Sequence, residues 1–254
     1  MNRTTVKLGG AGRQSKGPID IQVLLMHSLE NMKVELGESH PDTLTTMNSL
    51  AIAYGQQGQY NEAEILFKQC FDKRKSVLGE SHPDTLDTME KLGSTYRLQG
   101  KCREAEVLLK QCLAKMKLVI GENHSDTLAT MNNLALTYEH QLKHSKAEVL
   151  LKQCLAKMKL VIGENHSDTL GTKSNLADNY SYQGKYNEAE ILYKQCLDKM
   201  KLVFGESHPV ILNTMNHLAS CYHRQEKYRE AQVLFEQMLR KEEGGTRREP
   251  SCFT

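Results

Sequence analysis

The chain has 254 residues, of which 39% are hydrophobic and 25% are charged, so it can bury a sizeable core and is not expected to be disordered. Four basic residues fall within the first 17 positions, and the remainder is slightly acidic, which excludes a basic nucleic-acid-binding surface on the folded part. Because no apolar run approaches roughly 18 residues and the start has no hydrophobic signal core, we expect a cytoplasmic protein without membrane insertion.

One segment of the chain recurs almost without change. The residues from Glu106 to Leu128 return letter for letter from Glu148 to Leu170. Five histidines also recur at a spacing of 42 residues, at His40, His82, His124, His166 and His208. A period of this size is typical of arrays in which one supersecondary unit stacks on the next. The sequence therefore predicts a solenoid.

In chain order, residues 1–17 are predicted to be a flexible basic tail, and residues 18–37 a half repeat containing one helix. The first full repeat, 38–79, has a helix, a break at residues 57–59, and a second helix that Gly79 ends in a left-handed conformation. The same plan returns in repeats 80–121, 122–163, 164–205 and 206–243. Residues 244–254 are predicted to be a second flexible tail. This count gives eleven helices and no strand.

The recurring histidines stand at predicted helix starts. In Ser39-His40-Pro41-Asp42, a polar cap residue is followed by a proline and then by an acid that favours the positive end of the helix dipole. A catalytic histidine is needed once, beside a nucleophile or an acid. Repetition at every turn between repeats therefore indicates capping or packing.

Three features of the repeats lead to further predictions. The periodic cysteines Cys70, Cys112, Cys154 and Cys196 are predicted to be core residues, because successive repeats hold them too far apart for one tetrahedral metal. Lys173 replaces a core methionine and must find a partner. Leu142 and Glu226 stand where the first repeat has Gly58, so the same turn geometry would cost each about 1 kcal/mol.

The repeats resemble those of a known family. The chain is similar to the tetratricopeptide repeat signature at Leu50-Ala51-x-x-Tyr54, Gly58-x-Tyr60-x-x-Ala63 and Phe67. It resembles kinesin light chain repeats more closely at Leu36-Gly37-Glu38-x-His40-Pro41-Asp42-Thr43-Leu44, Asn132-Asn133-Leu134-Ala135 and Tyr186-Asn187-Glu188-Ala189-Glu190. The resemblance covers residues 20–243. It implies an all-α fold, a right-handed α-solenoid of about five and a half tetratricopeptide repeats, with a concave groove for an extended peptide.

Helical geometry assigns the residues of that groove. If the apolar face of each first helix turns toward its partner helix, a second face is left for the groove. The candidate groove residues are Asn48, Ile52, Arg97, Asn132, Asn133, Leu136, Asn175, Tyr182, Asn213, Asn216 and Arg224. Asparagine suits this role because its amide both donates and accepts hydrogen bonds. Replacing Asn132 and Asn133 with alanine is then expected to weaken partner binding and to leave the melting temperature nearly unchanged.

The sequence favours a non-enzymatic scaffold or adaptor without cofactor or metal. Its partners would be protein or peptide segments, and the resemblance adds kinesin heavy chain, cargo proteins and association with microtubules. A heptad segment that would join a motor is not recognisable, so attachment to a motor stays open. The alternative is a regulatory or sensor array of a larger multidomain signalling protein, such as a nucleotide-binding receptor. An enzyme is disfavoured because no catalytic cluster stands outside the repeat pattern.

Overall fold

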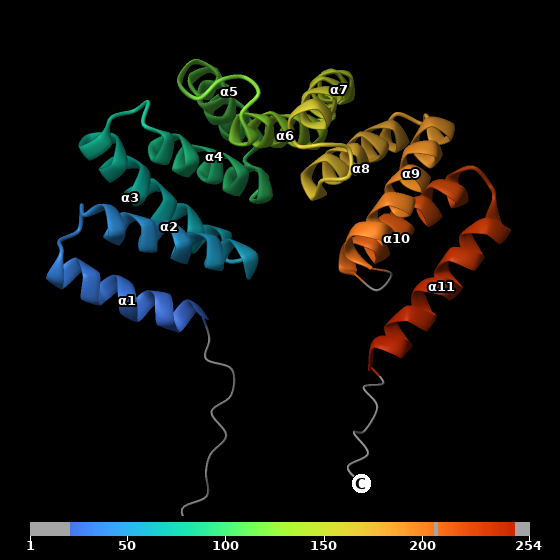
Figure 1. Ribbon diagram of the computed structural model, residues 1–254, viewed down its shortest axis with the longest axis horizontal. Coiled ribbons are helices and arrows are strands. Elements are labelled where there is room, and N and C mark those ends of the chain that lie inside the picture. The colour runs from blue at the N-terminus through green and yellow to red at the C-terminus, as the bar shows by residue number, and fades with distance from the viewer. Residues whose placement is uncertain (1–20, 206–207, 247–254) are drawn as a thin grey trace, which may run out of the picture.

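The computed structural model describes residues 21–205 and 208–246, and within them it contains eleven helices and no strand. The helices are α1 (Ile21–Glu35), α2 (Pro41–Gln56), α3 (Tyr60–Leu78), α4 (Pro83–Leu98), α5 (Cys102–Val119), α6 (Ser125–His140), α7 (His144–Val161), α8 (Ser167–Tyr182), α9 (Tyr186–Phe204), α10 (Pro209–Arg224) and α11 (Tyr228–Thr246). Each helix packs against the next, and the described residues form an open arch (Figure 1). The predicted all-α solenoid is confirmed.

The helices form two layers. In Figure 1, the even-numbered helices from α2 to α10 lie on the inner side of the arch, and α3, α5, α7, α9 and α11 lie on the outer side. Neighbouring inner helices also contact each other directly, α2 with α4 and so on to α10. We therefore call α2, α4, α6, α8 and α10 the inner helices. Their exposed sides form the inner face.

Small residues let the two helices of a pair approach closely. Ala51 of α2 and Ala63 of α3 are fully buried and pack with Phe67. In the second repeat, Gly93 replaces the alanine of α2, and a methyl group there would lie 2.7 Å from the Leu109 side chain. Because protein interiors are close-packed, such contacts hold successive pairs in one stacking geometry.

The recurring histidines cap the inner helices. The Nδ1 atom of His124 accepts a hydrogen bond from the backbone N–H of Asp126 at 3.3 Å. Equivalent bonds of 3.2–3.3 Å occur at His40, His82, His166 and His208. Each bond satisfies one of the backbone donors that a helix start leaves without a partner. The predicted capping role is confirmed, with histidine rather than the preceding residue as the cap.

The conformations of the turns confirm the prediction for Leu142 and Glu226 and correct the one for Gly79. Leu142 and Glu226 adopt φ angles of 59° and 61°, so both keep the left-handed conformation that Gly58 adopts with φ 77°. Side chains in this region cost about 1 kcal/mol each. The prediction for Gly79 needs a correction, because its φ of 93° is combined with a ψ of 160°. That conformation lies outside the left-handed helical region and is accessible essentially only to glycine.

The ends of the array differ slightly from the predicted boundaries. The last helix ends at Thr246, so Gly244 and Gly245 belong to α11 and not to the tail. Helix ends are the least certain feature of a sequence pattern, since glycine weakens a helix without always ending it. The predicted tail at 1–17, the start of the half repeat at residues 18–20 and residues 247–254 lie outside the described residues.

The buried polar and sulfur-containing residues behave as predicted. The periodic cysteines are fully buried, and the Cys112 thiol donates to the Leu86 carbonyl oxygen at 3.3 Å. Burial raises the pKa of Cys112 to about 12, so the thiol stays protonated. Lys173 is 3% exposed, and its Nζ lies 3.4 Å from Glu164 Oε1 and 3.3 Å from Gln195 Oε1.

Ion pairs recur between the outer helices and the next turn. Glu106 of α5 accepts hydrogen bonds from Lys110 at 2.6 Å and from Lys143 at 2.9 Å. Both ammonium groups also lie over the ring of Tyr138, 5.6 and 5.7 Å from its centroid. The bonds from Lys110 and Lys143 lower the pKa of Glu106 to about 2. The same set recurs in the neighbouring repeats and holds adjacent repeats in register.

Candidate peptide-binding groove

All of the predicted groove residues lie on the inner helices, but their exposure differs widely. The exposed residues are Tyr182, Asn213, Asn216 and Arg224. The half-buried residues are Ile52, Arg97, Asn132, Asn133, Leu136 and Asn175. Asn48 is buried, with 8% of its surface exposed. Among the predicted residues, the polar ones on α10 are therefore more exposed than those on α2, α4, α6 and α8 that carry amide or guanidinium groups.

Several of the predicted asparagines join neighbouring inner helices. The Asn48 amide of α2 donates to Asp87 Oδ2 of α4 at 3.3 Å. The Asn133 amide of α6 donates to Glu90 of α4. Asn175 of α8 donates to Asn132 Oδ1 of α6 at 3.1 Å.

A fourth contact completes the connection of the inner helices. His217 Nδ1 of α10 lies 2.6 Å from Asp178 Oδ1 of α8. We call these four contacts the polar row; it links all five inner helices and includes Asn48, Asp87, Glu90, Asn132, Asn133, Asn175, Asp178 and His217. Amide groups used in this row are less available to a peptide than the sequence suggested.

The acids of the polar row differ in exposure, because Glu90 is buried whereas Asp87 and Asp178 are half-buried. Glu90 is 3% exposed, and its carboxylate contacts Lys91 Nζ at 2.8 Å and accepts from Ser94 at 3.0 Å. Partial burial raises the pKa of Asp87, because solvent stabilises its charge less than in the unfolded chain. A buried carboxylate is stable only while its hydrogen-bond donors remain in place. The amide of Asn133 therefore supports the fold.

Two cavities open at the C-terminal ends of α6 and α8, and Tyr182 lines both. The first has a volume of about 180 Å³ and is lined by Glu139, His140, Leu142, His144 and Tyr182. The second has a volume of about 210 Å³ and is lined by Asp178, Ser181, Tyr182, Tyr193, His217 and Ser220. Each cavity thus contains one carboxylate, one or more histidines and the ring of Tyr182.

The carboxylate of the second cavity already has partners. Tyr193 donates its hydroxyl hydrogen to Asp178 Oδ1 at 2.5 Å, and His217 lies on the same oxygen. The contact with Asp178 raises the pKa of His217, and burial beside that carboxylate raises the pKa of Tyr193. Asp178 therefore acts mainly to position these two side chains.

Glu139 of the first cavity was not among the residues predicted from the sequence. It is 8% exposed, and its Oε1 has no hydrogen-bond partner among the described residues. Burial raises the pKa of Glu139 to about 7. The repeat period contains the missing signal, because Glu139 follows the predicted residue Arg97 by 42 positions and occupies the same place in the next repeat.

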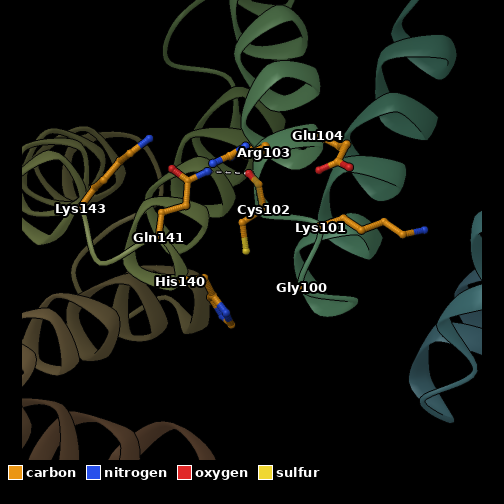
Figure 2. Close-up of a pocket in the computed structure, with 8 residues that line it drawn as sticks. All are labelled: Gly100, Lys101, Cys102, Arg103, Glu104, His140, Gln141 and Lys143. Carbon is orange, nitrogen blue, oxygen red and sulfur yellow. Dashed lines mark hydrogen bonds between the residues drawn. The ribbon is translucent and has the colours of Figure 1, made fainter.

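A larger hollow of about 690 Å³ lies at the edge of the array and not in the polar row. It is lined by Gly100, Lys101, Cys102, Arg103, Glu104, His140, Gln141 and Lys143 (Figure 2). Gln141 Nε2 donates to the Cys102 carbonyl oxygen at 2.7 Å, which joins the two turns. A similar hollow recurs at Gly184 to Lys227. We interpret both as gaps between stacked turns, because each is lined by residues of two successive turns.

None of the described helices is long and apolar enough to cross a bilayer. In the same part of the chain, no group of three or more His, Cys, Asp or Glu side chains is arranged to hold a metal ion. The inner face and its two cavities are thus the strongest candidate site.

Solved structures with the same fold include kinesin-light-chain-like proteins. A candidate kinesin light chain with nearly identical TPR-like repeats, from Podosopora anserina, is 29% identical with a TM-score of 0.67, over 82% of this chain and 99% of that chain. BtubC (BKLC) from P. vanneervenii has a TM-score of 0.75 and 18% identity, over 92% of this chain and 94% of that chain. The second likeness is one of fold alone.

Comparison of the sequence with protein families agrees with the structure. No curated protein matches the chain. One tetratricopeptide repeat model matches residues 43–84, 85–126 and 127–168, and a second matches residues 162–240. These matches cover most of the described residues, and the 42-residue spacing of the first model equals the period of the histidine caps. The chain belongs to the tetratricopeptide repeat family, whose arrays are protein–protein interaction scaffolds, and its repeats are of the kinesin light chain-like type.

Proposed function

We propose that the chain is a non-enzymatic scaffold that binds extended peptide segments of other proteins along its inner face. The observation that carries this proposal is the set of exposed amide and guanidinium groups that Asn213, Asn216 and Arg224 present on α10, the last of five successive inner helices. An extended peptide has a backbone donor or acceptor at every residue, and amide side chains can pair with both. A solenoid presents such groups over a length that no compact domain offers.

The exposed asparagines of α10 provide the sharpest test. Peptides are first selected from a displayed library of random 12-residue sequences against the wild-type chain, and their dissociation constants are measured by fluorescence anisotropy. Replacing Asn213 and Asn216 with alanine is expected to weaken binding by about tenfold, the loss of one or two hydrogen bonds. The melting temperature should stay unchanged, because both side chains are exposed.

A matched double variant controls for the loss of two amide groups. Asn123 and Asn165 are exposed in the turns before α6 and α8 and are not among the candidate groove residues, so their replacement with alanine should leave the affinity unchanged. Equal affinity of the wild-type chain and the Asn213→Ala, Asn216→Ala variant would contradict binding along the inner face.

The similarity to kinesin light chain supports a narrower proposal. We infer that the bound segments belong to kinesin heavy chain or to a protein cargo, and that binding takes place in the cytoplasm on microtubule-associated motors. The same anisotropy comparison, with the purified kinesin heavy chain tail in place of the selected peptides, tests this step. If the selected peptides bind and the tail does not, the proposal of a peptide-binding scaffold stands and the heavy chain is excluded as its partner.

A further inference from the structure

The cavity at the ends of α6, α7 and α8 has the dimensions of a pocket for one side chain. Its volume of about 180 Å³ is below the range of about 300–1,000 Å³ that is usual for small-molecule sites. Leu142, held in its left-handed turn, forms part of the wall, and the inner helices α6 and α8 supply Glu139 and Tyr182. The cavity therefore opens beside the inner face where an extended segment would lie.

The acid in this cavity lacks the full set of partners that buried acids normally have. Glu139 is more than nine-tenths buried, is in no ion pair among the described residues, and leaves Oε1 without a hydrogen-bond donor. The Nδ1 atom of His144 in the same cavity also lacks a partner there. A buried carboxylate with too few donors is unfavourable unless a positive group or a hydrogen-bond donor is supplied from outside. The site is thus complementary to a cation.

An aromatic ring completes this complementarity. Tyr182 is 66% exposed and stacks on His144, with ring centroids 5.9 Å apart and an angle of 29° between the planes. The face of a tyrosine ring attracts ammonium and guanidinium groups. The same ring also lines the cavity that contains Asp178, whose carboxylate already contacts His217 and Tyr193.

We propose that this cavity, formed by Glu139, His144 and Tyr182, receives a lysine or arginine side chain of the segment bound along the inner face. The proposal rests on the proposed function, since the backbone of that segment must first lie on the inner helices. It adds a specificity: the bound segment is basic at the position that lies over the end of α8.

The neighbours of Glu139 predict how binding depends on pH. Burial is the largest influence and raises the pKa of Glu139 to about 7; Asp178 of α8 adds to this effect, while the Asn179 amide and Arg97 of α4 oppose it. The imidazoles of α6 and α7 that face the same cavity are those of His140 and His144. Lowering the pH from 8 to 6 protonates Glu139, which removes the negative charge from the cavity and weakens the binding of a cation.

Defined peptide pools test the proposal. Four pools of acetylated and amidated 11-residue peptides have an equal mixture of amino acids at ten positions and arginine, lysine, norleucine or glutamate at the centre. At pH 8, the arginine and lysine pools are expected to bind the wild-type chain about tenfold more tightly than the norleucine pool, the effect of one charge-assisted hydrogen bond. In the Glu139→Gln and Tyr182→Ala variants, this preference should fall to less than about threefold.

Controls separate this proposal from the proposed function. The Glu230→Gln variant removes an equal charge from an exposed position on α11 and should keep the full preference. Binding of all four pools with equal affinity, or tightest binding of the glutamate pool, would overturn the basic specificity and leave peptide binding intact. Failure of every pool to bind the wild-type chain would overturn both proposals. Tyr182→Ala keeps the test valid if Glu139→Gln alters the fold, because Tyr182 is an exposed residue.

Discussion

Replacing Glu139 with glutamine is expected to stabilise the array at pH 8 by on the order of 3 kcal/mol. The pKa of this carboxyl rises from 4.5 in the unfolded chain to about 7 in the fold. The native state therefore binds more protons than the unfolded state between these two values, and stability falls as the pH rises through that window. Glutamine cannot ionise, so the variant does not lose stability in this way. Urea unfolding monitored by circular dichroism from pH 4 to pH 8 measures the difference.

The pH dependence of that difference identifies its cause. The free energies of unfolding of the two proteins should converge near pH 4, where the Glu139 carboxyl is protonated in both states. Glu230→Gln, in the exposed first turn of α11, should stay within about 1 kcal/mol of the wild-type chain at every pH. A Glu139→Gln variant that is less stable than the wild-type chain at pH 8 would contradict the interpretation that Glu139 is ionised at this pH and lacks hydrogen-bond donors. When removal of an acidic side chain stabilises a protein, that side chain is typically retained because it binds a ligand.

Replacing Asn132 and Asn133 with alanine is expected to lower the free energy of unfolding by about 2–4 kcal/mol. Asn133 donates to the buried carboxylate of Glu90, and Asn132 accepts from Asn175. Removing the Asn133 amide leaves Glu90, which is 3% exposed, with fewer hydrogen-bond donors. Removing the Asn132 amide breaks the link between α6 and α8. Urea unfolding of the double variant measures the loss.

The control for this experiment is again the double alanine at Asn123 and Asn165. These side chains are exposed in the turns, and their loss should change the free energy of unfolding by less than about 0.5 kcal/mol. Equal stability of the Asn132→Ala, Asn133→Ala variant and the wild-type chain would show that the polar row does not hold the inner helices together. These contacts lead us to predict a loss of stability, whereas the sequence alone predicted a nearly unchanged melting temperature for this double variant.

The repeat period made the fold predictable. Because one unit recurs every 42 residues, each helix start and turn was observed several times, and His124 or Leu142 could be interpreted by comparison with its equivalents. The side chains that face a partner helix were also predictable, because they follow the helical period. The end of α11 was not, since Gly244 and Gly245 give the same signal as a helix end and as a weakened last turn.

The chemistry of the inner face was less accessible from the sequence. Helical periodicity places Asn133 on that face but does not specify that the acid in reach is Glu90, which comes from the preceding repeat. Glu139 was not predicted as a groove residue, although the repeat period relates it to Arg97, because its burial with an unsatisfied oxygen depends on the packing of α6, α7 and α8. Contacts between repeats depend on the angle at which pairs stack, and a one-dimensional pattern does not contain that angle.

Photo-crosslinking tests the central claim, binding along the inner face, most directly. The tightest peptide selected against the wild-type chain is prepared with a photoreactive diazirine residue at each position in turn, and the crosslinked residues are identified by mass spectrometry. We predict crosslinks to exposed and half-buried residues of α6, α8 and α10, with successive peptide positions reaching successive inner helices. Crosslinks confined to α5, α7 and α9 would place the peptide on the outer side and contradict the account.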